Sequence, residues 1–439
     1  MQRMCRAVFA GRQSSLNRMF FGWHVVGAAF AVAVFAWGIG FYGPPVFLET
    51  LHRSRGWPVS LISAAITAHF LFGAAVIANL AALHRRFGIP AVTRAGAVLM
   101  AVGLLGWAFS RTPWEVFAAT PLSGAGWAMT SGAALNAMVS PWFVRLRPAA
   151  LSMAFNGASM GGVIFSPLWV ALIAGLGFSG AACIVAATVA ATLWLVAGHY
   201  LTRTPADMGL LPDGDEGDVC GAARKGREGA VPLGPPWRER RFCTLAASAS
   251  LGLFAQIGLI AQLFSLLVPP LGAEGAGATM GFATACAIAG RTVLGMVIGP
   301  NTDRRAIAAA NVSFQACGSI VLVLAAGHSI PLLLLGCVLF GLGLGNVTSL
   351  PPLIAQTEFR PEDVQRVVAL VTACSQASFA FAPVVFGVLR SLGQTMGLSH
   401  QEGSAPLLFG AAALIQLSAA AVVMLGRRPA PSRAASIAL

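Results

Sequence analysis

The residue with the clearest chemical potential is Arg291, which lies inside the apolar run 276–300 with no acidic residue within one helical turn. The free energy of inserting an arginine at the centre of a membrane-spanning helix is unfavourable by roughly 2.5–3.5 kcal/mol, so an arginine at that depth indicates a functional site. Its planar guanidinium matches a carboxylate through two parallel hydrogen bonds. Arg291 is therefore a candidate site for an anion. The alternative is a structural arginine that bonds to carbonyls of a neighbouring helix.

Uncharged polar side chains recur in several apolar runs, where they could orient a bound molecule. Thr284 lies seven residues before Arg291, on nearly the same face of a helix. The other polar residues that we expect at a binding site are Asn156, Gln256, Gln262, Asn346 and Gln376. For any one of them the simpler interpretation is a hydrogen bond between helices, worth about 0.6 kcal/mol on average.

Two further titratable residues lie in or near apolar runs. His69 falls midway along the run 59–82, and an imidazole can carry a proton near neutral pH. We favour the simpler interpretation, a neutral histidine bonded to a neighbouring helix. Glu49, at the end of the first run, is expected to be a solvated charge at the rim. The eight cysteines form no CxxC pair and no cluster with histidines, so we predict no metal, no cofactor and no disulfide framework.

Composition sets the kind of element that carries these residues. Of the 439 residues, 57% are hydrophobic and 10% are charged, and the mean hydropathy is +0.76. In typical soluble domains about a quarter of the residues are charged. An ordinary soluble enzyme, a disordered protein and a nucleic-acid-binding domain are therefore excluded. The net charge of +13 does not indicate a nucleic-acid partner, because the basic residues lie mostly in short gaps between apolar runs.

Twelve apolar runs are long enough to cross a bilayer as helices. They span residues 22–48, 59–82, 91–110, 114–140, 149–175, 178–201, 242–268, 276–300, 306–327, 330–352, 364–391 and 405–426. The fold class predicted is an all-α polytopic membrane protein. Residues 202–241, rich in Gly, Pro and charge, are expected to be a flexible linker. They separate an N-terminal six-helix bundle, 1–201, from a C-terminal six-helix bundle, 242–439.

Basic residues concentrate in the gaps on one side, the side of both termini and the linker. Loops rich in arginine and lysine remain in the cytoplasm. We therefore predict a multi-pass protein of the plasma (inner) membrane with both termini cytoplasmic. It is expected to act as a monomer, with the lipid bilayer as its surroundings and no nucleic-acid partner.

The two sets of six runs repeat at an offset close to 217 residues. Leu122-x-Gly124-x-Gly126 matches Leu339-x-Gly341-x-Gly343, Arg147-Pro148 is similar to Arg360-Pro361 further on, and Pro167 corresponds to Pro383. A parallel repeat implies a pseudo-two-fold axis along the membrane normal and a shared central cavity. The two prolines are expected to kink their helices and to act in gating. The glycine motif lies within an apolar run, so it indicates close helix approach and not a nucleotide-binding loop.

On these residues the chain resembles the major facilitator superfamily of secondary transporters. Residues 299–305, GPNTDRR, are similar to the Gly-x-x-x-Asp-Arg loop motif of the family, with Gly299, Asp303 and Arg304 in its positions. The equivalent loop of the first half retains Arg86 and Gly88, but Ala81 and Arg85 replace the Gly and Asp of the motif. The ion pairs that the Asp of this motif makes in the family are therefore not expected in their usual form in the N-terminal half.

A narrower resemblance is to the monocarboxylate transporters and oxalate–formate exchangers. It rests on RTPADMGLLPDG at 203–214, on Pro141-Trp142-Phe143 followed by Arg147, and on Gly290-Arg291. The resemblance implies that Arg291 grips a substrate carboxylate. Proton-linked animal members have an aspartate one turn before this arginine, and Ala287 stands there, so that route for proton coupling is absent. A single central positive charge favours a monoanion over a dianion.

The leading hypothesis is a secondary active transporter of a small organic anion, a monocarboxylate, that works by alternating access. Apolar groups such as Trp37 and Phe41 would accept the organic part. The alternative is an exporter of amphipathic or drug-like compounds on the same fold, with a structural Arg291. An enzyme is disfavoured, because the sequence offers no paired intramembrane carboxylates, and its only lysine, Lys225, lies in the linker, which excludes a P-loop.

Overall fold

A computed structural model of the protein describes residues 20–214, 236–297, 302–398 and 404–427. Within them the chain is helical and contains no strand. The α-helices are α2 (Phe21–Gly40), α3 (Gly43–Arg55), α4 (Val59–Phe87), α5 (Ile89–Phe109), α6 (Pro113–Thr130), α7 (Gly132–Val139), α8 (Arg147–Tyr200), α10 (Arg240–Val297), α11 (Arg304–Ala325), α12 (Ile330–Leu344), α13 (Leu350–Glu358), α14 (Pro361–Phe379), α15 (Ala382–Thr395) and α16 (Pro406–Leu425). Three short 3-10 helices, η1 (Ala206–Met208), η2 (Pro212–Gly214) and η3 (Pro236–Arg238), lie in and beside the linker.

These helices make twelve crossings, as the sequence predicts. In the described part of the chain, 8 segments are long and apolar enough to cross a membrane. Two of them, within α8 and α10, cross twice, and each turns at a glycine with positive φ, Gly177 (69°) and Gly272 (71°). The fourth and tenth crossings complete the set. Both are interrupted, at Ser131 between α6 and α7 and at residues 345–349 between α12 and α13.

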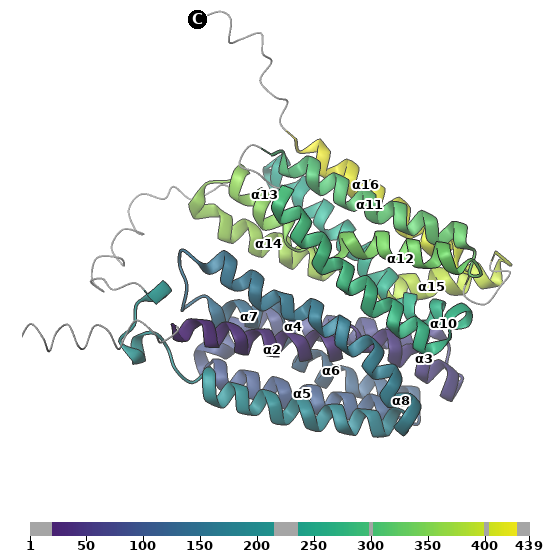
Figure 1. Ribbon diagram of the computed structural model, residues 1–439, viewed down its shortest axis with the longest axis horizontal. Helices are drawn as coiled ribbons and strands as arrows, with labels where there is room; N and C mark the ends of the chain where they lie inside the picture. Colours follow the sequence, from purple (N-terminus) through teal and green to yellow (C-terminus); the bar gives the residue numbers. More distant parts are fainter. Residues whose placement is uncertain (1–19, 215–235, 298–301, 399–403, 428–439) are drawn as a thin grey trace, which may run out of the picture.

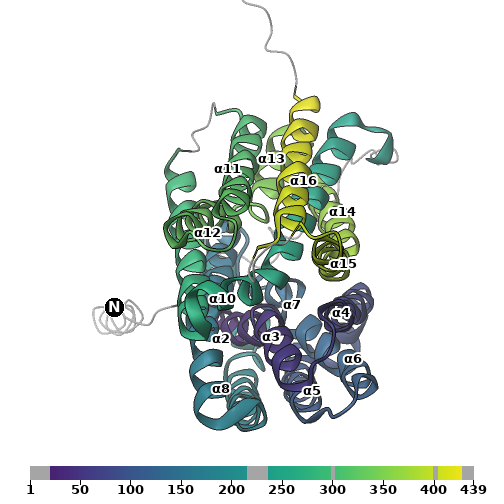
Figure 2. The same cartoon turned by 90° about the vertical axis from the view of Figure 1, so that its right-hand side faces the viewer.

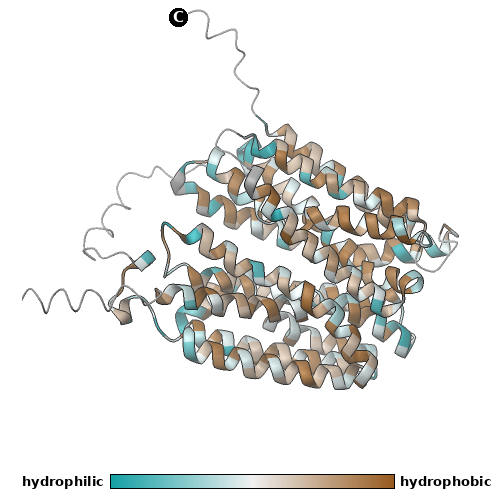
Figure 3. Ribbon diagram, in the orientation of Figure 1, coloured by the Kyte–Doolittle hydropathy of each residue, from teal (hydrophilic) through white to brown (hydrophobic). Residues whose placement is uncertain are grey.

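The helices before the linker form an N-terminal half and those after it form a C-terminal half, which pack side by side (Figure 1). Hydrophobic residues cover the length of the helices, and hydrophilic residues gather at their ends (Figure 3). We call the end that carries Phe20, Gly88, Tyr200 and Arg240 the linker end, and the opposite end the far end. A surface of this kind is suited to lipid along its sides and to water at both ends.

The repeated glycines let helices of the same half approach backbone to backbone. A Cβ atom on Gly126 of α6 would lie 2.3 Å from the backbone N of Met100 on α5. A Cβ atom on Gly341 of α12 would lie 2.4 Å from the backbone O of Ala283 on α10. The motif therefore packs helices closely, as predicted, and both copies serve this purpose in equivalent crossings.

The two halves meet mainly at the far end. There α10 packs against α3 and α15 packs against α4, as the view from that end shows (Figure 2). The most extensive contact between the halves is that of α8 with α10, where Gly277 and Gly281 lie against Val163 and Ser166. Every residue of α10 from 255 to 268 is buried. In α4 the residues from Ile62 to Phe70 are mostly buried, whereas Leu71, Phe72 and many that follow toward the linker end are exposed. The halves are thus closed against each other at the far end and more open at the linker end.

The first part of the linker is folded, although the sequence analysis expected it to be flexible. The carboxylate of Asp213 accepts backbone N–H bonds from Val144, Arg145 and Leu146 at 2.7–3.3 Å, directly before α8 begins. The backbone N–H of Asp213 donates to the carbonyl of Trp142 at 2.9 Å. The RTPADMGLLPDG segment therefore fixes the loop that leads into α8.

Substitution of a close-packed glycine tests the helix packing. Gly126→Ala should lower the midpoint of thermal unfolding in detergent, because an overpacked contact costs about 1–3 kcal/mol. Gly27→Ala is the matched control, since a Cβ atom there meets nothing within 4 Å. Equal midpoints for the two variants would contradict the proposed backbone contact between α5 and α6.

The stability of the folded linker segment 203–214 is expected to depend on pH through the Asp213 carboxylate. Its burial raises its pKa, but the N–H bonds from Arg145, Leu146 and Val144 and the Arg145 charge outweigh burial, so the pKa lies below its usual value. The stabilisation is thus present at neutral pH and is lost as the pH falls through the lowered pKa. Asp213→Asn should speed proteolysis of segment 203–214 about fivefold at pH 7, since a capping carboxylate screened by water contributes about 1 kcal/mol. The difference from the parent chain should disappear in acid; a constant difference would exclude the carboxylate as its cause.

Candidate functional site

Arg291 is positioned by a glycine and by a break in a neighbouring helix. A Cβ atom on Gly290 would lie 1.9 Å from the carbonyl O of Leu342, so α10 and α12 touch backbone to backbone beside Arg291. Helix α12 ends at Leu344, and carbonyls at a helix C-terminus lack helical partners and carry partial negative charge. The Gly345 carbonyl accepts from Nε and Nη2 of Arg291 at 3.3 and 3.1 Å. The guanidinium is therefore held against the interrupted tenth crossing.

The remaining bond of Arg291 joins the two halves. Its Nη1 donates to Oδ1 of Asn156 on α8 at 2.9 Å. These three bonds use three of the five N–H groups of the guanidinium. Arg291 is half-buried, and in the described part of the chain no carboxylate lies within ion-pair distance of it. The site thus holds a cation whose protein partners are all neutral, with two N–H groups to spare.

Tyr42 completes this group of residues and was missed by the sequence analysis. It follows the break between α2 and α3 and is 4% exposed. Its hydroxyl lies beside the side chain of Thr284 and within electrostatic range of Arg291. The Thr284 hydroxyl itself donates to the Met280 carbonyl at 2.8 Å. Gly162 of α8 makes room, because a Cβ atom there would lie 2.7 Å from the Tyr42 ring.

Arg291, Asn156 and Thr284 are therefore brought together, whereas the other predicted polar residues lie elsewhere. Gln256 accepts a 3.5 Å bond from Gln315 inside the C-terminal half. Asn346 donates to Asn311 at 2.9 Å in the same half. Gln262 lies at the far-end contact between the halves, and Gln376 lies half-buried on α14.

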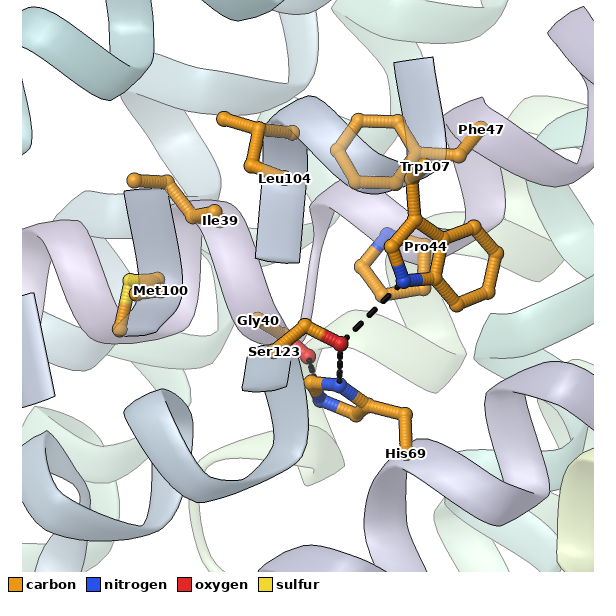
Figure 4. Close-up of a pocket in the computed structure, with 9 residues that line it drawn as sticks. All are labelled: Ile39, Gly40, Pro44, Phe47, His69, Met100, Leu104, Trp107 and Ser123. Atoms are coloured by element: carbon orange, nitrogen blue, oxygen red, sulfur yellow. Dashed lines mark hydrogen bonds between the residues drawn. The ribbon is translucent and has the colours of Figure 1, made fainter. Parts of the chain in front are cut away.

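His69 lies in a small pocket within the N-terminal half (Figure 4). Its Nε2 lies 3.1 Å from the Gly40 carbonyl, which only accepts, so Nε2 carries the proton. Nδ1 then accepts from the Ser123 hydroxyl at 2.9 Å, and that hydroxyl accepts from Trp107 Nε1 at 3.2 Å. Every donor has an acceptor when the imidazole is neutral. This geometry suits a structural histidine that ties α4 to the end of α2.

One rim expectation was wrong. Glu49 is 6% exposed and lies at the contact between the halves, because α3 is packed beneath α10 and not splayed into solvent. Its carboxylate pairs with Arg53 one turn later on the same helix.

The loop motif of the C-terminal half builds a separate, fully paired charge cluster. Asp303 caps α11 by accepting from the backbone N–H groups of Arg305 and Ala306, and it pairs with Arg427 at 2.5 Å. Arg305, which sequence reasoning passed over for Arg304, binds both oxygens of Glu358 at 2.6 and 2.7 Å. Its other N–H groups donate to Thr244 and to backbone carbonyls at 2.8–2.9 Å.

The other predicted motif and gating residues take simpler roles. Arg304 donates to the Leu353 carbonyl, and Gly299 lies outside the described residues. Arg86 lies over the Phe87 ring at 5.1 Å, and Gly88 turns the chain into α5 with a φ of 81°. Pro383 follows a break at Ala380–Phe381, as expected. Pro167 contacts α10 near Gly281, but α8 continues as a helix through it.

Comparison with known proteins agrees with this architecture. Solved structures with the same fold include a D-xylose–proton symporter (13% identity, TM-score 0.70, covering 92% of this chain and 97% of that one) and a nucleoside transporter (13% identity, TM-score 0.65, covering 92% and 100%). Mouse (Mus musculus) monocarboxylate transporter 11 is 28% identical over 240 residues, which are 53% of this chain and 45% of that protein. The match thus spans less than half the length of this relative.

The family model described as Major Facilitator Superfamily matches residues 25–383, most of the chain. The twelve crossings, the internal repeat and this match agree, and the protein is a membrane transporter that belongs to the major facilitator superfamily.

Proposed function

We propose that the transporter carries a small monocarboxylate and that Arg291 binds its carboxylate. The observation that carries the proposal is the difference between Arg291 and Arg305, two arginines that lie among the helices of the C-terminal half. Arg305 has all five N–H groups bonded and faces a carboxylate of the protein. Arg291 uses three, and all go to neutral oxygens. A carboxylate from solution would supply the missing charge and take the spare donors.

The neighbours of Arg291 suit a small and partly apolar anion. Tyr42 and Thr284 place two hydroxyl groups beside the guanidinium, and the Thr284 hydroxyl already donates to the Met280 carbonyl. Trp37 packs edge-on to Phe155, one residue before Asn156, with ring centroids 6.2 Å apart. This aromatic pair gives the organic part of a substrate an apolar surface close to the guanidinium. The likeness to part of a monocarboxylate transporter also supports this class of substrate.

Alternating access follows from how the halves are packed. They are closed at the far end and more open at the linker end, so a substrate would reach Arg291 from the linker end in this conformation. Because basic residues gather at the linker end, we take that end to be cytoplasmic. Rocking of the N-terminal half (1–201) against the C-terminal half (242–439), within a monomer in the inner membrane, would expose the site to the other side.

Replacing Arg291 tests the substrate class directly. Arg291→Gln should weaken binding of lactate, measured by thermal shift and by uptake into proteoliposomes, roughly 30-fold, because a hydrogen bond to a charged group contributes about 2 kcal/mol. Arg291→Lys should retain part of the affinity. Arg111→Gln is the matched control, since it removes an exposed arginine of the other half that lies outside the loop motif. If no small carboxylate stabilises the parent protein, or if export of a neutral amphipathic compound proceeds equally in Arg291→Gln, the exporter alternative holds.

A second substitution puts a permanent carboxylate beside the guanidinium. Asn156→Asp places a negative charge at the atom that now lies 2.9 Å from Nη1. The internal ion pair should compete with the substrate and weaken lactate binding by at least about tenfold, or ~1.4 kcal/mol, in a partly buried setting. The control Asn156→Ala removes the bond without adding charge and should change affinity far less. Unchanged binding in Asn156→Asp would place the carboxylate of the substrate away from Arg291.

A further inference from the structure

The far-end contact between the halves is built around a second arginine, Arg390 of α15. Its Nη1 donates to Oε1 of Gln262 at 3.3 Å and to the hydroxyl of Ser265, both on α10. Its Nε is buried and has no hydrogen-bond partner. Gln262 also donates from Nε2 to the hydroxyl of Ser63 on α4 at 2.8 Å. Ser63 and Gln262 are 0% exposed, so this polar group is sealed between the halves.

The carboxylate that acts electrostatically on Arg390 comes from the other half. Glu49 of α3 is 6% exposed and acts electrostatically on Arg390. Its direct ion-pair partner, Arg53, is itself 58% exposed, so water screens much of that charge. The other charged residues and histidines that the structure describes in the far-end parts of the helices and turns are His52 and Arg55 on α3, His69 on α4, Arg111 and Glu115 where α5 leads into α6, Glu274 on α10 and His328 where α11 leads into α12. The far-end parts of α2 and α8 carry no charged residue.

Opening of the far end would separate these groups along the boundary between the halves. Glu49 and Ser63 belong to the N-terminal half and would move away together. Arg390, Gln262 and Ser265 belong to the C-terminal half, are bonded to one another, and would remain as a preformed set of donors. The Arg390 guanidinium would then lose the nearby negative charge of Glu49, and the Gln262 amide would lose the Ser63 hydroxyl that accepts its hydrogen bond. Such a set is complementary to a carboxylate from solution.

We propose that Arg390, Gln262 and Ser265 form an outer carboxylate site. While the far end is closed, Glu49 compensates the positive charge of Arg390. When the far end opens, a carboxylate from outside binds to the site. The inference rests on the proposed transport of a carboxylate, and it adds a place where that substrate first binds. Because the external carboxylate takes the place of Glu49 beside Arg390, the net charge around Arg390 would stay nearly constant while the far end opens. It would also make the outer gate respond to anions and not to neutral compounds.

The test uses a cysteine at the gate and two thiol reagents that differ in charge. In Ser63→Cys, the reaction rates with an anionic sulfonatoethyl and a cationic trimethylammonioethyl methanethiosulfonate are measured from the far side at low ionic strength. Rates are corrected for the chain without the added cysteine. Glu49→Gln should speed both reactions about fivefold or more, because the gate loses its charge contact, and should raise the anionic-to-cationic ratio. When Arg390→Gln is combined with Ser63→Cys, the ratio of the anionic to the cationic reaction rate should fall at least about threefold. Replacing sodium chloride with sodium acetate should slow the anionic reagent only in chains that retain Arg390.

Control variants keep the outcomes distinct. Arg55→Gln removes an exposed positive charge at the same end and should leave the ratio nearly unchanged. An equal fall in Arg55→Gln and Arg390→Gln, or no change in either, would overturn the outer site. If Ser63→Cys fails to fold, Thr67→Cys serves as reporter, since Thr67 accepts from the Val384 backbone N–H across the same contact at 3.1 Å. Arg291→Gln should leave the ratio unchanged, so loss of the proposed substrate and loss of the outer site are measured separately.

Discussion

The structure depends on how a guanidinium is satisfied where water is scarce. A buried charge needs both a counter-charge and a full set of hydrogen bonds. Arg305 has both and binds α11 to α10, α13 and α16, which makes it a fixed part of the C-terminal half. Arg291 has neither in full. The same residue type therefore serves as structure in one place and as a candidate for binding in the other, and the difference lies in the partners.

The backbone creates the Arg291 site more than the side chains do. Gly290 brings α10 against α12, and the interruption after Leu344 turns the Gly345 carbonyl into a free acceptor. On the other side, the break after Gly40 lets Tyr42 reach Thr284 over Gly162. Interrupted helices are tolerated in a bilayer only where protein or water satisfies the freed groups. The breaks in the first and tenth crossings thus coincide with the residues that could hold a substrate.

Hydrophobic length and repeat spacing sufficed to predict the fold, because both are properties of the chain alone. The twelve crossings, the paired glycine motifs and the intramembrane Arg291 were all read from the sequence and confirmed as structure. The site was only partly predictable. Tyr42 and Glu49 carry no periodic signal, and the residues of the other half that they lie near, Thr284 and Arg390, are more than 200 residues away in the sequence. Gln262 was recognised as polar, but its place at the far-end contact was not predictable, since helical spacing gives a face of a helix and not the depth or the neighbour that it meets.

The division between strong and weak contacts indicates how such a molecule can move. Within each half one polar network is complete, Arg305 with Glu358 in the C-terminal half and His69 with Ser123 in the N-terminal half, and these networks would resist separation. Between the halves the described residues make single hydrogen bonds, Ser63 with Gln262, Thr67 with Val384 and Asn156 with Arg291. Each contributes about 1 kcal/mol, and each partner can bond to water or to a substrate when the halves part. The bonds that must break during transport are therefore the ones that a carboxylate or water can replace, while those that define each half are left intact.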